Sequence, residues 1–234
     1  MLAVLRQRNF ALLWFGQLIS VTGDLVLYIA VPFYIYELTG SALATGGMFL
    51  AFTLPPLVLG SVAGVFVDRW DRRQTMIVAD AARAALLLAL LLARSREWVW
   101  IVYVVAALES SISQFFAPAK GALLPHLVEQ KDLVAANSLV GMSDGFTRIV
   151  GPSLGGALMG LGGLTTVVLV DSVSYLVSGI LILLIAAPSG TPAARSQTAL
   201  AWAGVWRDWL DGMRLVRAQR LLAGLLLVAA LAVL

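Results

Sequence analysis

The feature that most constrains the fold is a long uncharged run that ends abruptly in charged residues. Residues 41–67 carry no charged side chain, whereas five of the six residues 68–73 are charged. A helix of about 20 apolar residues crosses the roughly 30 Å apolar core of a bilayer, so this run is long enough to span it. Basic residues concentrate in cytoplasmic loops. We therefore expect the chain to leave the membrane at Asp68, on the cytoplasmic side.

The composition extends this expectation to the whole chain. Hydrophobic residues make up 60% of the sequence and charged residues 12%, against about 25% charged in a soluble domain. The net charge of +3 does not indicate nucleic-acid binding, because the arginines lie in short segments between apolar runs. There is no cysteine, which excludes disulfide and thiol chemistry. The lipid bilayer is thus an expected partner and nucleic acid is not.

Six successive apolar runs predict an all-α integral membrane fold with six transmembrane helices. Their approximate bounds are 10–36, 41–67, 75–93, 98–117, 136–161 and 162–187. The polar segment 120–132 is expected at the surface. Of the sixteen Lys and Arg residues, twelve fall on the side of the N-terminus, two on the opposite side and two within spans. The positive-inside rule then predicts a multi-pass protein of the cell membrane with a cytoplasmic N-terminus.

Composition changes predict three parts in the chain. Residues 1–187 are expected to form the six-helix transmembrane domain. Residues 188–220 are expected to form a cytoplasmic linker with an amphipathic helix in the membrane interface, since tryptophans recur there at helical spacing. Residues 221–234 rise only about 21 Å as a helix, which is too short to span. We expect them to begin a truncated seventh transmembrane helix, with a C-terminal half missing from this sequence.

The end of the second apolar run carries a glycine pattern. Gly60, Gly64 and Asp68 lie four apart, so they share one helix face, and glycines on such a face allow a neighbouring helix to approach closely. We expect a gating loop made of these three residues and the arginines that follow, namely Arg69, Arg72 and Arg73. An ordinary positive-inside loop is the alternative interpretation.

This loop resembles the one between helices 2 and 3 of the major facilitator superfamily, which reads Gly, then Asp-Arg, then a basic pair. The sequence departs from that pattern at Asp71, where the superfamily usually has Gly. A second element resembles the Gly-Pro-x-x-Gly-Gly sequence on helix 5 of antiporters in the superfamily. It consists of Gly151, Pro152, Gly155 and Gly156.

Further segments resemble one branch of this superfamily, which contains macrolide-efflux proteins and the enterobactin exporter. They are residues 116–125 and 209–214. The resemblance covers the whole chain and implies an N-terminal six-helix half with a 3+3 inverted repeat. It also implies a proton-coupled antiporter that exports a small amphipathic molecule, such as a drug or a siderophore.

Charged residues inside the predicted spans are the candidate site, because a charge at a helix centre costs about 2.5–3.5 kcal/mol. Asp24 and Glu109 lie near mid-depth in the first and fourth spans, which the resemblance places around a central cavity. Gln17 and Tyr28 share a face with Asp24, and Ser113 lies one turn from Glu109. Both carboxyl groups are candidate proton carriers, since burial disfavours the ionised form. A permanently protonated or hydrogen-bonded structural group is the alternative for each.

The fifth span contains Asp144 and Arg148, which are four apart and can form an ion pair along the helix. One interpretation is a self-contained structural pair. The other is that Arg148 exchanges partners with Asp24 or Glu109 as protons bind and leave.

The remaining ionisable residues are expected to be structural. Asp80 and Arg83, three apart in the third span, predict an ion pair near the inner leaflet, and Asp171 in the sixth span predicts a structural carboxyl group. His126 is expected to be solvated in a loop. The sequence contains no recognisable catalytic constellation, metal-ligand cluster or phosphate-binding loop, so neither an enzyme nor a cofactor is expected.

The sequence interpretation is therefore a transporter half whose partners are protons and a small molecule. Two alternatives stay open. One is an importer or lipid transporter on the same fold, and the other is a six-helix membrane scaffold that transports nothing. Carboxyl groups at mid-membrane depth favour a transporter over a scaffold.

Overall fold

The computed structural model describes residues 2–186, and in this range the chain is helical and contains no β-strand. The long helices are α1 (Arg8–Thr39), α2 (Ala42–Val67), α3 (Arg72–Leu87), α4 (Val99–Leu123) and α5 (Leu133–Leu183). Short 3-10 segments connect or extend them, namely η1 (Leu2–Arg6), η2 (Leu88–Leu92), η3 (Arg96–Trp98), η4 (Leu124–His126) and η5 (Gln130–Asp132). The predicted linker, 188–220, and the predicted seventh helix, 221–234, lie outside the described residues.

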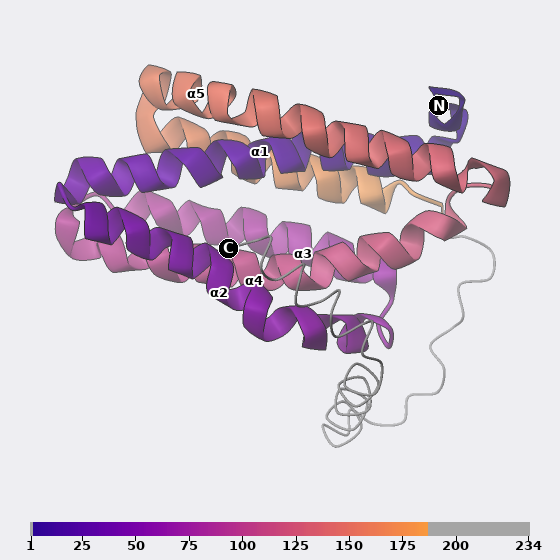
Figure 1. Cartoon of the computed structure of the whole chain (residues 1–234), viewed down its shortest axis with the longest axis horizontal. Coiled ribbons are helices and arrows are strands. Elements are labelled where there is room, and N and C mark those ends of the chain that lie inside the picture. Colours follow the sequence, from indigo (N-terminus) through magenta and orange to yellow (C-terminus); the bar gives the residue numbers. More distant parts are fainter. Residues whose placement is uncertain (1, 187–234) are drawn as a thin grey trace, which may run out of the picture.

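Helix α5 is two helical segments joined by a reversal of the chain. It has 51 residues, and a straight helix of that length would measure about 77 Å, more than twice the bilayer core. Gly162 and Gly163 break it, and Gly163 has a φ of 63°, which glycine adopts without steric cost. Figure 1 shows the second segment running back beside the first. The described residues thus contain the six helical segments that the sequence predicted.

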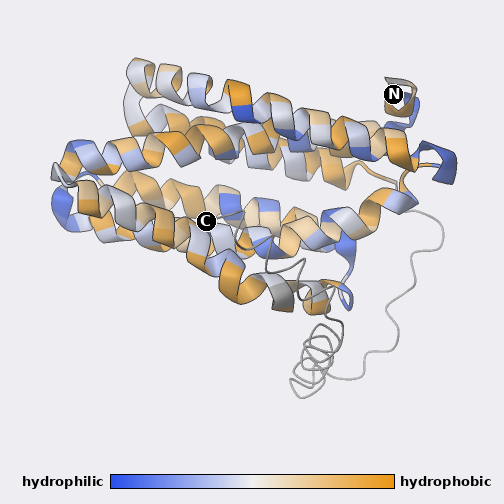
Figure 2. Cartoon of the chain, in the orientation of Figure 1, coloured by the Kyte–Doolittle hydropathy of each residue, from blue (hydrophilic) through white to orange (hydrophobic). Residues whose placement is uncertain are grey.

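The long helices are apolar enough to cross a membrane, and residues 2–186 contain five such spans when α5 is counted once. Apolar side chains also cover much of the outer surface. Leu43 is 87% exposed, and Leu57 and Ile149 are each 77% exposed. Figure 2 shows hydrophobic residues along the sides of the helices and hydrophilic ones gathered at the two ends of the bundle. This distribution is that of a surface whose solvent is lipid.

Helix α1 packs mainly against α5, α2 packs against α4, and α3 contacts both α4 and α5 (Figure 1). The buried apolar residues form two clusters along the bundle. One contains Val31, Leu87 and Val102, and the other contains Phe10 and Met76. The segments of α1, α3, α4 and α5 between these clusters carry the polar side chains of the interior.

Glycines set the distance between α1 and α5. A methyl group at Gly16 would lie 3.3 Å from the Cα of Ser178, on the second segment of α5. A methyl group at Gly151, on the first segment, would lie 2.5 Å from the Cβ of Leu25. Close backbone approach is the usual role of small residues between membrane helices.

Two predicted boundaries were wrong. Helix α4 continues through Pro118 to Leu123, beyond the predicted end near residue 117, so Lys120 lies in its last turn. Helix α3 begins at Arg72, earlier than the predicted residue 75, because the Asp71 side chain caps it. The Asp71 carboxylate accepts a hydrogen bond of 2.7 Å from the backbone N–H of Gln74, a standard N-cap interaction. The departure from glycine at position 71 therefore has a structural role.

Candidate functional site

A layer of polar side chains lies between the two apolar clusters. Four helical segments that are far apart in the sequence contribute to it. Its central members are Asp24 on α1, Asp80 and Arg83 on α3, Glu109 and Ser113 on α4, and Tyr175 on the second segment of α5. We call these six residues the polar layer.

Arg83 is the centre of this layer, with only 3% of its surface exposed. Its Nη2 forms an ion pair of 2.5 Å with Asp80 Oδ1. Its Nη1 donates to Ser113 Oγ at 3.1 Å and to Tyr175 Oη at 3.4 Å. The guanidinium carbon lies 4.2 Å from the ring centroid of Tyr175 and 4.7 Å from that of Phe116. Hydrogen bonds, charge and ring stacking together hold this cation in place.

Tyr175 joins the two carboxyl groups that the sequence singled out. Its hydroxyl oxygen is hydrogen-bonded to Asp24 Oδ1 and lies 3.0 Å from Glu109 Oε1. Ser113 Oγ donates to the same Glu109 oxygen at 2.9 Å. A tyrosine hydroxyl has one proton to donate and can accept two hydrogen bonds. With Arg83 donating to it, all its contacts are satisfied when one of the two carboxyl groups carries a proton.

The charges of the layer support the same conclusion. Among the described residues, Arg83 is the one cation in this interior, and it is already paired with Asp80. Arg83 is the cation that acts on Asp171 among the described residues, whereas Asp24 also shares a cavity with Arg148. Burying several unpaired carboxylates is costly. Proton binding to some of them removes that cost.

Asp24 also lines an open cavity of about 520 Å³ between α1 and the first segment of α5. The other lining residues are Val21, Leu25, Tyr28, Asp144, Thr147 and Arg148. Tyr28 packs edge-on against Phe49 of α2, with ring centroids 6.0 Å apart. Asp24 is therefore the residue that connects the buried layer with a solvent-sized space.

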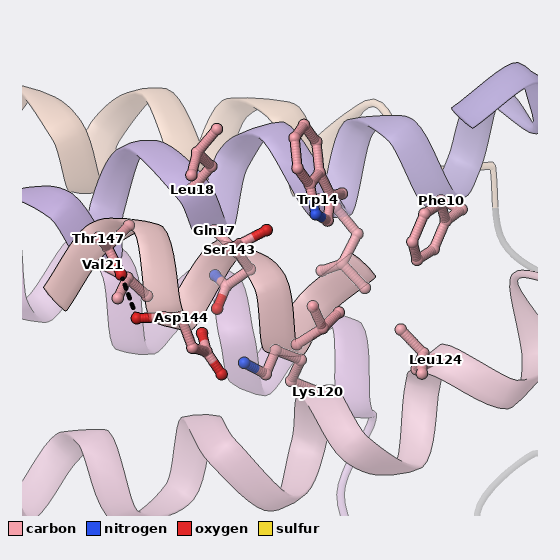
Figure 3. A pocket seen from close by; sticks show the side chains of 12 residues that line it. Phe10, Trp14, Gln17, Leu18, Val21, Lys120, Leu124, Ser143, Asp144 and Thr147 are labelled. Atoms are coloured by element: carbon pink, nitrogen blue, oxygen red, sulfur yellow. Dashed lines mark hydrogen bonds between the residues drawn. The ribbon is translucent and has the colours of Figure 1, made fainter. Parts of the chain in front are cut away.

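The predicted ion pair between Asp144 and Arg148 is not formed in the described part of the chain, and that interpretation was wrong. Both side chains are exposed, and an exposed pair gains little from holding one geometry. Asp144 also borders a small second cavity, of about 20 Å³, together with Gln17 and Lys120. Figure 3 shows the Lys120 side chain directed toward Asp144.

Of the two carboxyl groups with which Arg148 could exchange partners, Asp24 lines the same cavity as Arg148 and Glu109 does not. Arg148 shares the open cavity with Asp24, whereas Glu109 contacts Ser113 and Tyr175. Gln17 borders the small cavity, and its Nε2 has no hydrogen-bond partner among the described residues.

The two glycines of the predicted gating loop do not mediate close packing against the described residues. A methyl group at Gly60 would lie 3.6 Å from Gln114 Oε1, and one at Gly64 would have nothing within 4 Å. Helix α2 instead approaches α4 through other contacts, such as the hydrogen bond of 2.8 Å from Ser110 Oγ to the carbonyl of Phe52. Asp68 and Arg69 are exposed.

The basic pair of the loop is engaged within this chain. Arg72 Nη1 donates to the carbonyl of Ala122 at 3.0 Å and lies 2.9 Å from His126 Nε2. His126, expected to be merely solvated, therefore has a protein partner. Arg73 donates to two carbonyls in the last turn of α5. The loop thus holds the ends of α4 and α5, whose last carbonyls lack helical partners.

The Gly-Pro-x-x-Gly-Gly element divides between two surroundings. Gly151 and Gly155 are buried against α1, and a methyl group at Gly155 would lie 3.0 Å from the carbonyl oxygen of Val26. Pro152 is half-buried. Gly156 has open space beside it and lines a separate cavity of about 540 Å³. Gly151 and Gly155 therefore allow close packing of α5 against α1, whereas Gly156 forms part of a cavity wall.

The sequence interpretation missed half of the polar layer. Tyr175 was not considered, and Asp80 and Arg83 were assigned to a structural pair, which the structure does contain. The sequence did not show that this pair is linked to Asp24 and Glu109 through the hydroxyl group of Tyr175. A signal was nevertheless present, since Asp171, Ser174, Tyr175 and Ser178 recur at helical spacing within an apolar span. Within residues 2–186 no group of three or more His, Asp or Glu side chains could hold a metal ion.

Comparison with known proteins agrees with this architecture. The family model described as "Major Facilitator Superfamily" matches residues 13–234. The chain belongs to the major facilitator superfamily. It therefore belongs with multi-pass membrane transporters and not with enzymes, as the sequence predicted.

Named relatives in the superfamily include efflux proteins. Macrolide efflux protein A of Streptococcus pyogenes is 29% identical over 225 residues, which cover 95% of this chain and 55% of that protein. Macrolide efflux protein A of Enterococcus faecalis is 29% identical over 194 residues, covering 82% and 58%. The chain spans about half the length of the curated relatives it matches. The predicted resemblance to macrolide-efflux proteins is confirmed.

One solved structure shares this fold over most of the chain. It is a crystal structure of a bacterial homologue of the iron transporter ferroportin in the outward-facing state with soaked iron. The TM-score is 0.61 at 22% identity, and the match covers 74% of this chain and 48% of the other. This likeness concerns the fold alone.

Proposed function

We propose that this chain is the N-terminal half of a proton-coupled antiporter that exports a small amphipathic molecule, such as a drug or siderophore. The observation that carries the proposal is the bridge from Asp24 through Tyr175 to Glu109, with Arg83 on the same hydroxyl group. The efflux proteins among the relatives support export. Antiport, the coupling ion and the substrate belong to the proposal.

The bridge suits proton exchange because its protons can be redistributed without moving a helix. In one state Asp24 holds the proton and Glu109 accepts from Tyr175. In the other state the two carboxyl groups change roles. Arg83 stabilises whichever carboxylate is ionised, through the shared tyrosine oxygen. Each state leaves the hydroxyl group of Tyr175 fully hydrogen-bonded.

The open cavity beside Asp24 is the proposed substrate-binding site, where a substrate could meet the proton-exchanging carboxyl group. Asp24, Asp144 and Arg148 place charges of both signs beside the apolar side chains of Val21 and Leu25. An amphipathic molecule with a cationic group fits such a lining, since two carboxyl groups face one guanidinium. In the proposed cycle the bound substrate replaces the proton on Asp24, and the proton returns when the substrate leaves.

The proposal includes the cellular arrangement. The N-terminus is cytoplasmic in the cell membrane, and the six helical segments form a 3+3 repeat that works together with a second half of the transporter. Asp68 and Arg69 then face that second half on the cytoplasmic side. A six-helix scaffold would have no use for protons shared between mid-membrane carboxyl groups.

Glu109→Gln in the complete transporter tests the proposal. The amide keeps the size and hydrogen bonding of Glu109 and removes only its titration. We expect uphill, gradient-driven export to be lost while substrate binding is retained, with Asp24→Asn as the companion variant. Glu97→Gln, at an exposed position in η3, is the matched control and should export normally. Export by Glu109→Gln against a gradient at the wild-type rate would remove Glu109 from the mechanism.

A further inference from the structure

Asp171 is a buried carboxyl group that the proposed exchange does not use. It lies on the second segment of α5, one turn before Tyr175, and has 0% of its surface exposed. Ser174 Oγ lies 3.1 Å from its Oδ1 and also 2.8 Å from its backbone carbonyl. Its other carboxyl oxygen, Oδ2, has no hydrogen-bond partner among the described residues.

Gly23 on α1 provides the space for this carboxyl group. A methyl group at Gly23 would lie 2.2 Å from Asp171 Oδ1 and 2.6 Å from Ser174 Oγ. Gly16, two turns before Gly23 on α1, contacts Ser178, which lies two turns after Asp171 on α5. Because the contacts advance in opposite directions along the two helices, α1 and the second segment of α5 pack antiparallel in this register. Asp171 therefore lies against the backbone of α1 at the residue that precedes Asp24.

The charged surroundings of Asp171 favour its protonated form. The titratable groups close enough to influence its charge are Asp24 on α1, Glu109 on α4, Arg83 on α3 and Tyr175 on its own segment. Two of these are carboxyl groups, and Arg83 is engaged by Asp80. A carboxylate with one hydroxyl donor and no cation of its own is strongly disfavoured in a dry interior.

We propose that Asp171 is a further proton-binding residue of the transporter, a reservoir that exchanges its proton with Asp24 across Gly23. The proposal rests on the proposed function. When Asp24 gives up its proton to the cavity, the proton on Asp171 passes to the Asp24 carboxylate and leaves to the cavity in turn, so that both carboxyl groups are ionised. When the cavity is next open to protons, Asp24 binds one, passes it back, and binds a second. Because Asp171 has no exposed surface, its proton reaches the cavity in this proposal through Asp24.

Asp171→Asn in the complete transporter tests the role in transport. Asparagine keeps the shape and can still accept from Ser174, so a merely structural Asp171 would tolerate the change. We expect uphill export to fall at least tenfold while substrate binding is unchanged. The matched control is Ser172→Ala, which alters the adjacent buried residue, whose hydroxyl group also lacks a partner, and should export normally. Wild-type export by Asp171→Asn would overturn the proposal.

Infrared spectroscopy of the purified protein tests the proton itself, independently of transport. We expect a protonated-carboxyl band at neutral pH that Asp171→Asn removes and that Gly23→Ala shifts, since its methyl group presses on Asp171. The Gly23→Ala comparison decides the assignment if Asp171→Asn does not fold. Asp24→Asn should slow deuterium exchange of this band at least tenfold. Absence of the band, or exchange at the wild-type rate in Asp24→Asn, would overturn the reservoir. Normal export by Glu109→Gln would instead contradict the proposed function alone.

Discussion

Tyr175 and Asp24 are 151 residues apart in the chain, and the hydroxyl group of the first is hydrogen-bonded to the carboxyl group of the second. This bond connects the second segment of α5 with the middle of α1. The same hydroxyl oxygen contacts Glu109 and accepts from Arg83. One tyrosine thereby links three ionisable residues that reside on three different helices.

Removing that hydroxyl group should affect both stability and export. Tyr175→Phe keeps the ring under the Arg83 guanidinium but removes the hydroxyl partner of Asp24 and leaves Glu109 with Ser113 as its hydrogen-bond donor. We expect the free energy of unfolding to fall by about 1–3 kcal/mol, the usual cost of an unsatisfied buried polar group. Uphill export by the complete transporter should fall as well. Unfolding in detergent and vesicle transport measure the two effects.

A second tyrosine supplies the control for this experiment. Tyr103 Oη donates to the carbonyl of Ala44 at 2.7 Å, away from the polar layer. Tyr103→Phe should lose a comparable hydrogen bond and leave export unchanged. If Tyr175→Phe exports as well as Tyr103→Phe, the bridge has no part in transport.

The ion pair between Arg83 and Asp80 should show strong energetic coupling. Arg83→Gln leaves the Asp80 carboxylate buried without its partner, which we expect to cost about 3–5 kcal/mol. The double variant Arg83→Gln, Asp80→Asn removes both charges and should recover a large part of that loss. A double-mutant cycle on unfolding in detergent measures the coupling. Additive effects of the two substitutions would contradict the expectation.

Two glycines should respond in opposite ways to the same substitution. Gly151→Ala places a methyl group 2.5 Å from the Cβ of Leu25, so α1 and α5 must separate, at an expected cost of about 1–3 kcal/mol. Gly64→Ala meets nothing within 4 Å and should be neutral or stabilise its helix by up to about 1 kcal/mol. Thermal unfolding of the two variants under the same conditions makes the comparison. Equal destabilisation would show that the Gly64 face is also packed.

The cytoplasmic loop should stabilise the end of α5. Arg73 donates to the carbonyls of Ile182 at 3.1 Å and Leu183 at 2.5 Å, where a helix end attracts positive charge. Arg73→Gln should lower stability by about 1–3 kcal/mol, because these hydrogen bonds are to a charged group. Hydrogen exchange of the last turn of α5 should speed up locally. Arg96→Gln, at an exposed position in η3, is the control and should leave that exchange unchanged.

Local sequence patterns determined the membrane class, the six helical segments and the candidate carboxyl groups Asp24 and Glu109. Each of these depends on properties that a short stretch carries by itself. Hydropathy over about 20 residues decides whether a helix is stable in lipid. The Gly162–Gly163 reversal could likewise be read from two adjacent residues.

The tertiary structure alone decided which polar residues meet. Asp80, Arg83 and Tyr175 belong to the third and sixth spans, which the resemblance did not place around the cavity, and only packing turns their polar faces toward Asp24 and Glu109. The register of α1 against α5 depends on Gly16, Gly23 and Gly151, whose close contacts involve residues more than a hundred positions away. Spacing along one helix shows which side chains share a face. It does not show what that face contacts, because the contact is selected by the combined packing energy of all the helices.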